Sequence, residues 1–299
     1  MRVTMGPMPL RNLRSPARPP ILVTGVPRSG TTWLARQLAL APGTALAGRE
    51  PMNPRGSQYG LGGTLHAWTR LNQPSRHQQA VLRTAYLGLN PMVYSRYGVR
   101  QWAAPVPGVR VIVKDPFALL SIETLHHQTG AQAVVVVRHP GAILASYRRM
   151  GWSPDLEELD PIAQARLGAD RALSPSGDAA TDMGAFWAAL HDIAIADIDA
   201  TGALVVFHED IATGGVEAAR LLYERLGLRM TQRSELGWAP VKAEAADAAR
   251  LHNFDRDSST VARGWRAATD EHELAALEHT AGSTLEHLRA RAIDLGPGA

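Results

Sequence analysis

The stretch Ile21–Trp33, ILVTGVPRSGTTW, decides the fold of this chain. A short apolar run ends in a loop bounded by Gly25 and Gly30, and the loop leads into a helical pattern that begins at Thr31. This order indicates a strand, a tight turn and a helix N-terminus. Glycine lets the backbone approach a ligand closely, and the free N–H groups of a first helical turn bind anions. The stretch therefore predicts a phosphate-binding loop.

The loop differs from the common nucleotide-binding loop at one position. The Walker A pattern G-x-x-x-x-G-K-[ST] is matched at Gly25, Gly30 and Thr32, but Thr31 stands where the pattern has lysine. The cation lies inside the loop instead, at Arg28. A simple strand-to-helix turn would also explain the two glycines. Arg28 favours the phosphate loop, because a guanidinium in an anion-facing turn needs an anionic partner.

The composition sets limits on the class of protein. A chain of 299 residues can form one large α/β domain or two small ones. It has no cysteine, which excludes disulfides, thiolate metal sites and a cysteine nucleophile. The net charge of +3 suits an anionic ligand and is too weak to indicate nucleic acid as a partner.

The ends and the hydropathy of the chain indicate its location. No apolar run approaches the roughly 18 residues of a membrane span, so we expect no transmembrane segment. Residues 1–20 are basic, free of acids and rich in proline, without the apolar stretch of a secretory signal. They predict a flexible tail on a cytoplasmic protein, and a basic tail that touches a membrane surface or a partner is the less favoured alternative.

Four apolar runs predict the strands of a parallel sheet. Each of the last three is followed by charged residues and then by a helical pattern, which is typical of parallel strands buried on both faces. We expect an α/β fold, a P-loop-type doubly wound parallel sheet flanked by helices, with ligands at the carboxyl ends of the strands. The runs are 21–23, 109–113, 133–137 and 203–207.

The segments between the runs predict the rest of the domain. Residues 45–63, rich in Gly, Pro and Asn, indicate a loop near the ligand crevice, and 64–88 indicates a helical lobe. The proline-rich insertion at 151–182 is either a lid or a surface excursion. An amphipathic pattern that opens at Asp270 predicts a C-terminal helix. We see no linker within 21–290 and expect residues 21–299 to form a single domain.

The predicted strand ends carry the chemistry. Arg28 lies in the first loop, Lys114 and Asp115 end the second strand, and Arg138 ends the third. Three cations at one edge of a sheet imply a polyanionic ligand. A Walker-type NTPase needs an acidic residue at such a strand end to hold magnesium, and this chain has arginine there. No histidine in the chain has ligand spacing shared with carboxylates, so we assign no metal site.

The two phosphate elements resemble those of the sulfotransferases that use 3′-phosphoadenosine 5′-phosphosulfate (PAPS). Pro27–Trp33 is similar to their 5′-phosphosulfate loop, and Arg138–Ser146 is similar to their 3′-phosphate element, including the eight-residue step from arginine to serine. Lys114–Phe117 resembles its counterpart in tyrosylprotein sulfotransferases, and Phe207–Asp210 resembles a further family landmark. The resemblance covers roughly residues 20 to 230 in order.

The resemblance implies roles for the matching residues. Arg138 and Ser146 would hold the 3′-phosphate of PAPS. Trp33 would lie against the adenine, although a core position on the first helix is an equal alternative. The 5′-phosphate and sulfuryl oxygens would be held by the side chains and backbone N–H groups of Arg28, Ser29, Gly30, Thr31 and Thr32.

The resemblance also implies a general base. In the cytosolic relatives a histidine two residues after the strand-end lysine takes the acceptor proton, but that position is Pro116 in this chain. Golgi and bacterial relatives use a glutamate after the first helix, where this chain has Arg49 and Glu50. We therefore predict Glu50 as the base, with a surface ion pair to Arg49 as the alternative. Lys114 would stabilise charge on the bridging oxygen, and Arg28 would contribute to the same stabilisation.

A late segment departs from the pattern of the cytosolic relatives. Those proteins close the 3′-phosphate site with an Arg-Lys-Gly loop, and this chain offers Arg256, Ser258 and Arg263 instead.

The sequence thus predicts a sulfotransferase that moves the sulfuryl group of PAPS to an acceptor hydroxyl. The acceptor, whether a small molecule, a sugar or a lipid-linked alcohol, and the oligomeric state are left open by the sequence. An ATP-dependent P-loop kinase or phosphotransferase and a catalytically silent nucleotide-binding adaptor are the alternatives.

Overall fold

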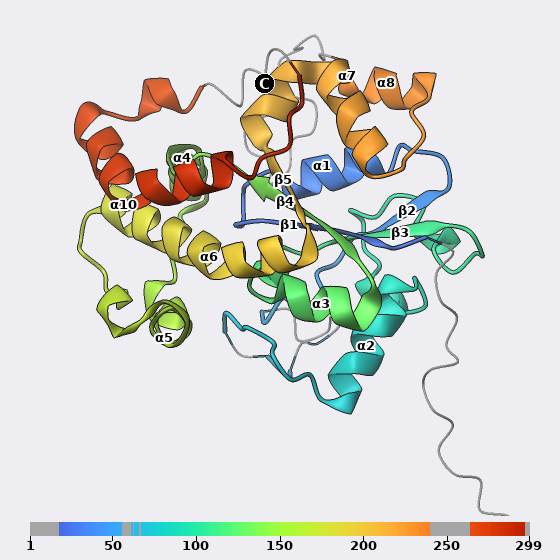
Figure 1. The fold of residues 1–299 in the computed structure, drawn as a ribbon, viewed down its shortest axis with the longest axis horizontal. Coiled ribbons are helices and arrows are strands. Elements are labelled where there is room, and N and C mark those ends of the chain that lie inside the picture. Colours follow the sequence, from blue (N-terminus) through green and yellow to red (C-terminus); the bar gives the residue numbers. More distant parts are fainter. Residues whose placement is uncertain (1–17, 56–60, 62, 66, 240–263, 297–299) are drawn as a thin grey trace, which may run out of the picture.

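The computed structural model describes residues 18–55, 61, 63–65, 67–239 and 264–296 of the chain. In these ranges a parallel sheet has the strand order β2-β3-β1-β4-β5 (Figure 1). The predicted doubly wound α/β fold is confirmed. The strands are β1 Ile21–Thr24, β2 Thr44–Ala47, β3 Arg110–Lys114, β4 Gln132–Val137 and β5 Leu204–Phe207.

The central strand β1 fixes where the site lies. Val23 pairs with Lys114 of β3 on one side and with Val134 of β4 on the other. The loop that follows β1 therefore opens between the carboxyl ends of β3 and β4, where the strand order reverses. In a doubly wound sheet this is the crevice in which ligands bind.

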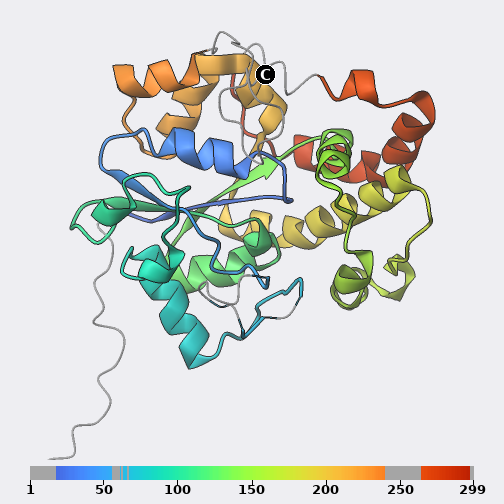
Figure 2. The ribbon, with the colours of Figure 1, turned by 180° about the vertical axis from the view of Figure 1, so that it is seen from behind.

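Helices cover both faces of the sheet. Figures 1 and 2 show α1, α7 and α8 on one face, and α2, α3 and α6 on the other, with α10 packed along α6. The helices are α1 Thr31–Leu38, α2 Arg76–Tyr86, α3 Ile122–Thr129, α4 Pro140–Met150, α5 Leu156–Leu167, α6 Ala179–Thr201, α7 His208–Arg225, α8 Gln232–Trp238 and α10 Glu271–Arg289. Short 3-10 turns are η2 Pro91–Val93, η3 Gln101–Ala103, η4 Pro116–Ser121, η5 Ala169–Arg171 and η6 Arg266–Ala268.

Side chains alternate between the two faces, as the pleat of a strand requires. In β1, Ile21 and Val23 pack in the cluster of α1 and α7, whereas Leu22 packs in the cluster on the opposite face. In β4, Val134 and Val136 face the cluster of α1 and α7. Both faces of these strands are apolar because both are buried under helices, which explains the continuous Val-rich runs of the sequence.

The N-termini of α6 and α10 are capped by side chains, whereas that of α1 is not. Asp270 forms a capping box with Glu273 at the start of α10, and Asp178 accepts the N–H of Thr181 at 2.8 Å in α6. Helix α1 begins after Gly30 without a side-chain cap. Its first N–H groups therefore remain available to a ligand.

Two segments differ from the sequence-based expectations. The loop predicted for 45–63 is wrong at its start, because Thr44–Ala47 forms the edge strand β2. The helix predicted from residue 64 begins only at Arg76, after Pro74 and the capping residue Ser75. Strand β2 was missed because its sequence, TALA, lacks the β-branched run that marked the other strands.

The insertion at 151–182 contains α5 and η5, and α5 packs against α6. Arg55 pairs with Asp155 at 2.8 Å and with Glu158 at 3.2 Å, so the loop after β2 contacts the start of α5. Whether the insertion acts as a lid stays a prediction. Within the described ranges, no helix combines the length and apolarity needed to cross a membrane.

Candidate active site

The loop after β1 has a backbone that tolerates little substitution. Gly25 and Gly30 have φ angles of 146° and 100°. A Cβ on Gly25 would lie 2.3 Å from the carbonyl oxygen of Val136, and a Cβ on Gly30 would lie 2.4 Å from His208 Cδ2. Both glycines are therefore required by close approach as well as by conformation. The loop is held tightly against β4 and the start of α7.

Arg28 also has a positive φ, 76°. A non-glycine residue in this region costs of order 1–3 kcal/mol, and such strain gathers at functional sites. The Arg28 side chain donates from Nε to the Ser146 hydroxyl at 3.0 Å, and its guanidinium lies 6.0 Å from the ring of Trp152. The backbone carbonyl of Arg28 accepts a hydrogen bond from Arg138 at 3.1 Å. The structure thus brings together three residues that the sequence assigned to two phosphate sites.

This cluster is electropositive. Burial and the charge of Arg149 lower the pKa of the Arg28 guanidinium. Burial also lowers the pKa of Arg138, and the charges of Arg149 and Arg28 act in the same direction while Glu209 opposes them. Each shift means that the charged form is disfavoured by its surroundings. A polyanion bound here would relieve that cost.

Arg138 is fixed by the core beneath it. It is buried, and its carbonyl accepts a hydrogen bond from the indole of Trp187 at 3.0 Å. Trp187 is itself fully buried on α6. Helix α4 starts directly after His139 and carries Ser146, which is also buried, on the turn that faces Arg28. Sequence reasoning missed Trp187, because its role depends on a contact between residues 49 positions apart.

The carboxyl end of β3 carries the second half of the site. Lys114 forms an ion pair with Glu50, and both side chains are largely buried, with 10% and 19% exposed. Asn53 donates to the other carboxylate oxygen of Glu50 at 2.6 Å. Lys114 and Asn53 therefore both contact the carboxylate of Glu50. The ion pair of Glu50 with Arg49 stays the alternative, and Arg49 also donates towards the carbonyl of Met92 at 3.5 Å.

Asp115 positions the loop that carries Glu50. It is fully buried and accepts the N–H of Met52 at 2.5 Å and that of Phe117 at 3.1 Å. Burial, with the charge of Glu50 adding to it, raises the pKa of Asp115 to about 8, although both hydrogen bonds and Lys114 oppose the shift. These hydrogen bonds tie the backbone at Met52, two residues after Glu50, to the end of β3.

Ser29 lies within the loop, and Thr31, Thr32 and Trp33 follow it. The Ser29 hydroxyl is buried and has no hydrogen-bond partner among the described residues. Thr31 and Thr32 form the first turn of α1. Trp33 is half-buried and packs edge-on against the rings of His208 at 5.4 Å and Trp238 at 5.3 Å. This packing fits the core role for Trp33, and its adenine contact stays a prediction.

The late candidates Arg256, Ser258 and Arg263 lie outside the described residues. The description resumes at Gly264, and the next residue, Trp265, stacks on His139 with ring centroids 4.1 Å apart. A Cβ on Gly141 would lie 2.5 Å from the Trp265 ring, so this contact is close. The late part of the chain thus reaches the start of α4, beside Arg138.

Among the described residues, no group of three or more His, Asp or Glu side chains is arranged as a metal site.

Comparison with known proteins finds a matching family and similar solved structures. A model of the sulfotransferase family matches residues 19–232. No curated protein sequence matches the chain. Among solved structures, the sulfotransferase domain of the olefin synthase from Synechococcus PCC 7002 shares 19% identity, covers 95% of this chain and 98% of its own, and has a TM-score of 0.48.

Two further structures are similar at lower scores. Sulfotransferase STF9 from Mycobacterium avium shares 15% identity over 94% of this chain and 78% of its own, with a TM-score of 0.44. A retinol dehydratase, solved in a complex with retinol and PAP, shares 14% identity over 94% of this chain and 84% of its own, with a TM-score of 0.37. Since the family model spans well over half of its length, the chain belongs to the sulfotransferase family.

Proposed function

We propose that this chain transfers the sulfuryl group of PAPS to the hydroxyl of a small-molecule, sugar or lipid-linked acceptor. The observation that carries the proposal is the convergence of Arg28, Arg138 and Ser146 beside the uncapped N-terminus of α1. Guanidinium groups, hydroxyls and free helix N–H groups are the donors that phosphate and sulfate oxygens accept from best.

The residues present fit a donor with two anionic ends. The glycine-bracketed loop is packed so closely against Val136 and His208 that a Cβ at Gly25 or Gly30 has no room, so its backbone is held in one conformation at the start of α1. The buried hydroxyl of Ser29 has no hydrogen-bond partner among the described residues, and burial disfavours the charged forms of Arg28 and Arg138. We expect Arg28, Thr31 and Thr32 to hold the 5′ end of PAPS, and Arg138 with Ser146 to hold its 3′-phosphate.

The ion pair of Glu50 and Lys114 supplies the proton chemistry. PAPS, when bound, supplies the sulfuryl group that is transferred. As the acceptor oxygen forms its bond to sulfur, the bond from sulfur to the bridging oxygen of PAPS breaks and adenosine 3′,5′-bisphosphate leaves, while Glu50 takes the proton of the acceptor hydroxyl. Lys114 stabilises the negative charge that develops on the bridging oxygen, which is usually the largest contribution in such transfers. Because Lys114 already contacts Glu50, both side chains can act on the same sulfuryl group during its transfer.

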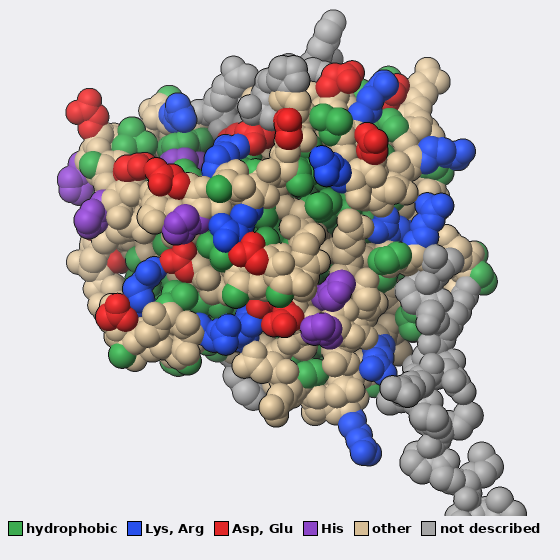
Figure 3. Space-filling model, viewed as in Figure 1, with side chains coloured by type: hydrophobic (Ala, Val, Ile, Leu, Met, Phe, Trp, Pro, Cys, Tyr) green, Lys and Arg blue, Asp and Glu red, His purple; other side chains and the backbone are tan. Residues whose placement is uncertain are grey.

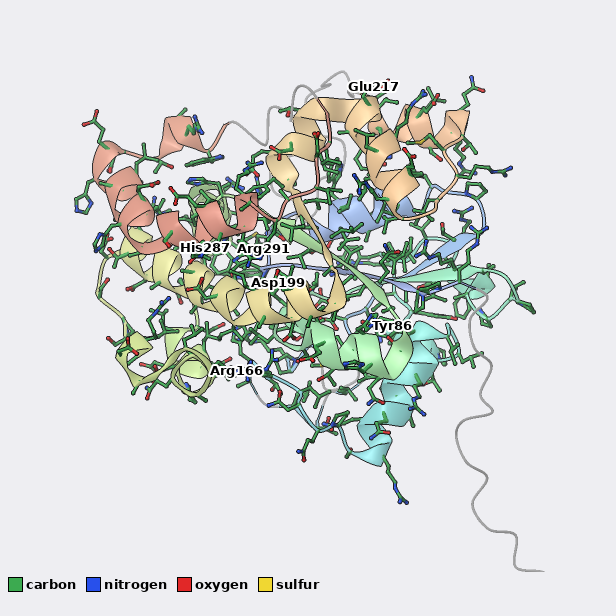
Figure 4. The ribbon with its side chains drawn as sticks, in the orientation of Figure 1. Tyr86, Arg166, Asp199, Glu217, His287 and Arg291 are labelled. Atoms are coloured by element: carbon green, nitrogen blue, oxygen red, sulfur yellow. The ribbon has the colours of Figure 1, made fainter. Side chains whose placement is uncertain are left out.

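Glu50→Gln tests this assignment. The substitution keeps the shape and the hydrogen bond from Asn53 but removes the base, so turnover should fall by roughly 100- to 10,000-fold while binding of adenosine 3′,5′-bisphosphate is retained. Glu217→Gln is the matched control, because Glu217 is an exposed carboxylate on the outer face of α7 (Figure 4). Near-normal turnover of the Glu50→Gln protein would refute the base assignment.

Calorimetry separates the proposal from the kinase and adaptor alternatives. We expect the wild-type chain to bind adenosine 3′,5′-bisphosphate more tightly than ATP with magnesium, since its loop lacks the Walker lysine and Arg138 follows strand β4 where a magnesium-binding acid would be needed. Tighter binding of ATP with magnesium would favour a kinase. Tight bisphosphate binding without sulfate transfer to any hydroxyl in a broad acceptor panel would favour an adaptor.

A further inference from the structure

The charges of this chain are distributed very unevenly along it. The first 114 residues contain 15 Lys and Arg and a single acid, Glu50, whereas the remaining 185 residues contain 16 Lys and Arg and 27 Asp and Glu. The overall charge of +3 hides this contrast. Such asymmetry between the parts of a chain indicates interaction with a polyanionic surface. In Figure 3 the visible surface near α2, at the lower right, is mostly tan with scattered blue side chains and no red ones.

The same part of the chain exposes large apolar side chains. Soluble proteins seldom expose several of these on one short segment, and such groups mark interaction sites. Here four lie within 18 residues, between α2 and β3. They are Leu89 at 42%, Met92 at 49%, Trp102 at 76% and Val106 at 52% exposed.

These side chains belong to one compact unit, which we call the 88–106 surface. The rings of Tyr94 and Trp102 meet edge-on at 5.1 Å. The Tyr94 hydroxyl donates to the carbonyl of Gly88 at 2.6 Å, and a Cβ on Gly88 would lie 2.5 Å from that of Ala104. The two halves of the segment are therefore packed on each other, and Leu46 of β2 pairs with Val99 between them.

Arginines accompany the apolar groups. Arg96 is exposed and lies over the ring of Tyr97, 4.9 Å from its centroid, and Arg83 is in the last turn of α2 before Leu89. Arg49 reaches the carbonyl of Met92. No acidic residue occurs between positions 51 and 114, so the segment that carries Arg83 and Arg96 contains no carboxylate.

We propose that the 88–106 surface docks this protein on an anionic lipid membrane. A tryptophan with aliphatic neighbours suits the boundary between headgroups and acyl chains, and the surrounding arginines suit anionic headgroups. Nucleic acid would use the cations but gains little from Leu89, Met92 and Val106. A second copy of the chain would place like charges against one another.

The 88–106 surface is joined to the loop that carries Glu50. The N–H of Arg49 donates to the carbonyl of Val93 at 2.8 Å, and Glu50 is the next residue. Docking would therefore hold the loop that carries Glu50 near the bilayer, where an acceptor dissolved in the membrane could reach it. This last consequence rests on the proposed function; the docking itself does not.

Vesicle co-sedimentation of the full chain, without donor or acceptor, tests the proposal. We expect binding to phosphatidylcholine vesicles that contain phosphatidylglycerol, little binding to pure phosphatidylcholine, and weakening by salt. The double variant Arg83→Gln/Arg96→Gln should reduce partitioning by roughly 30-fold, from about fivefold per cation. Trp102→Ser/Met92→Ser should reduce it by roughly tenfold or more. Leu236→Ser, at a residue 70% exposed on α8, is the matched control and should change nothing.

Several results would overturn the proposal. These are absent binding, equal binding to neutral and anionic vesicles, or loss of binding in Leu236→Ser equal to that in Trp102→Ser/Met92→Ser. Tighter binding to a single-stranded oligonucleotide than to vesicles would assign the surface to nucleic acid. Concentration-dependent dimers that Trp102→Ser/Met92→Ser abolishes would assign it to a second copy.

Circular dichroism checks that the variants fold, and the wild-type comparisons of lipid and salt need no variant. A chain that binds vesicles but transfers no sulfate would refute the proposed function alone.

Discussion

Replacing Arg28 by alanine should separate ligand binding from stability. In the wild-type chain this guanidinium is crowded by Arg149 and donates to Ser146 at 3.0 Å. A bidentate contact to a phosphate comprises two charge-assisted hydrogen bonds, each worth about 1.5–3 kcal/mol. The dissociation constant for adenosine 3′,5′-bisphosphate should therefore rise by roughly 100-fold or more.

The same substitution should not lower the stability of the ligand-free chain. It removes one partly buried charge from a crowded cluster and leaves the backbone strain at φ of 76° in place, so we expect Tm to be unchanged or to rise by about 2 °C for each kcal/mol gained. Titration calorimetry measures binding, and calorimetric unfolding measures Tm. Arg166→Ala, at an exposed position on α5 (Figure 4), is the control and should change neither.

Two outcomes would refute this reasoning. Bisphosphate binding by Arg28→Ala within a few-fold of wild type would show that the guanidinium does not hold the anion. A marked fall in the Tm of the ligand-free variant would show that the cluster is not destabilised by its own charge.

Two other predictions concern the loop and its support. Gly30→Ala places a Cβ 2.4 Å from His208 at φ of 100°. It should lower the free energy of unfolding by about 1–3 kcal/mol and abolish bisphosphate binding. Gly43→Ala is the control: it has φ of 73° and no atom within 4 Å, so it should show only the smaller conformational cost. Equal effects of the two variants would contradict the close contact. Because the pKa of Asp115 is raised to about 8 in the folded chain, the native state holds a proton that the unfolded state releases near pH 4. The free energy of unfolding should therefore fall as pH rises from about 4 to about 8, and urea titrations should show that Asp115→Asn flattens this slope. An unchanged slope would exclude Asp115 as its source.

The parts of the fold that could be predicted are those with a local signal. Four strands and the helices α1, α4 and α10 follow from apolar runs and helical periodicity, which act over a few residues. Strand β2 could not be predicted, because four residues of moderate propensity become a strand only when β3 lies beside them. The start of α2 was misplaced because Leu65, Trp68 and Leu71 are buried without being helical.

The sequence alone determined the chemistry of the site. It placed Gly25, Arg28 and Gly30 in a loop between strand and helix, and it put Arg138 at the end of a buried strand. Glycine conformation and the spacing of polar residues after an apolar run are local properties, so the linear chain is enough to fix them.

Only the tertiary structure decided which of these residues meet. Arg28 reaches Ser146 across 118 positions, and Glu50 reaches Lys114 across 64. Both contacts depend on the order and register of β3, β1 and β4, which are set by burial of the whole sheet between two layers of helices. Packing of distant segments has no period in the sequence, and so the partner of Glu50 became visible only in the folded chain.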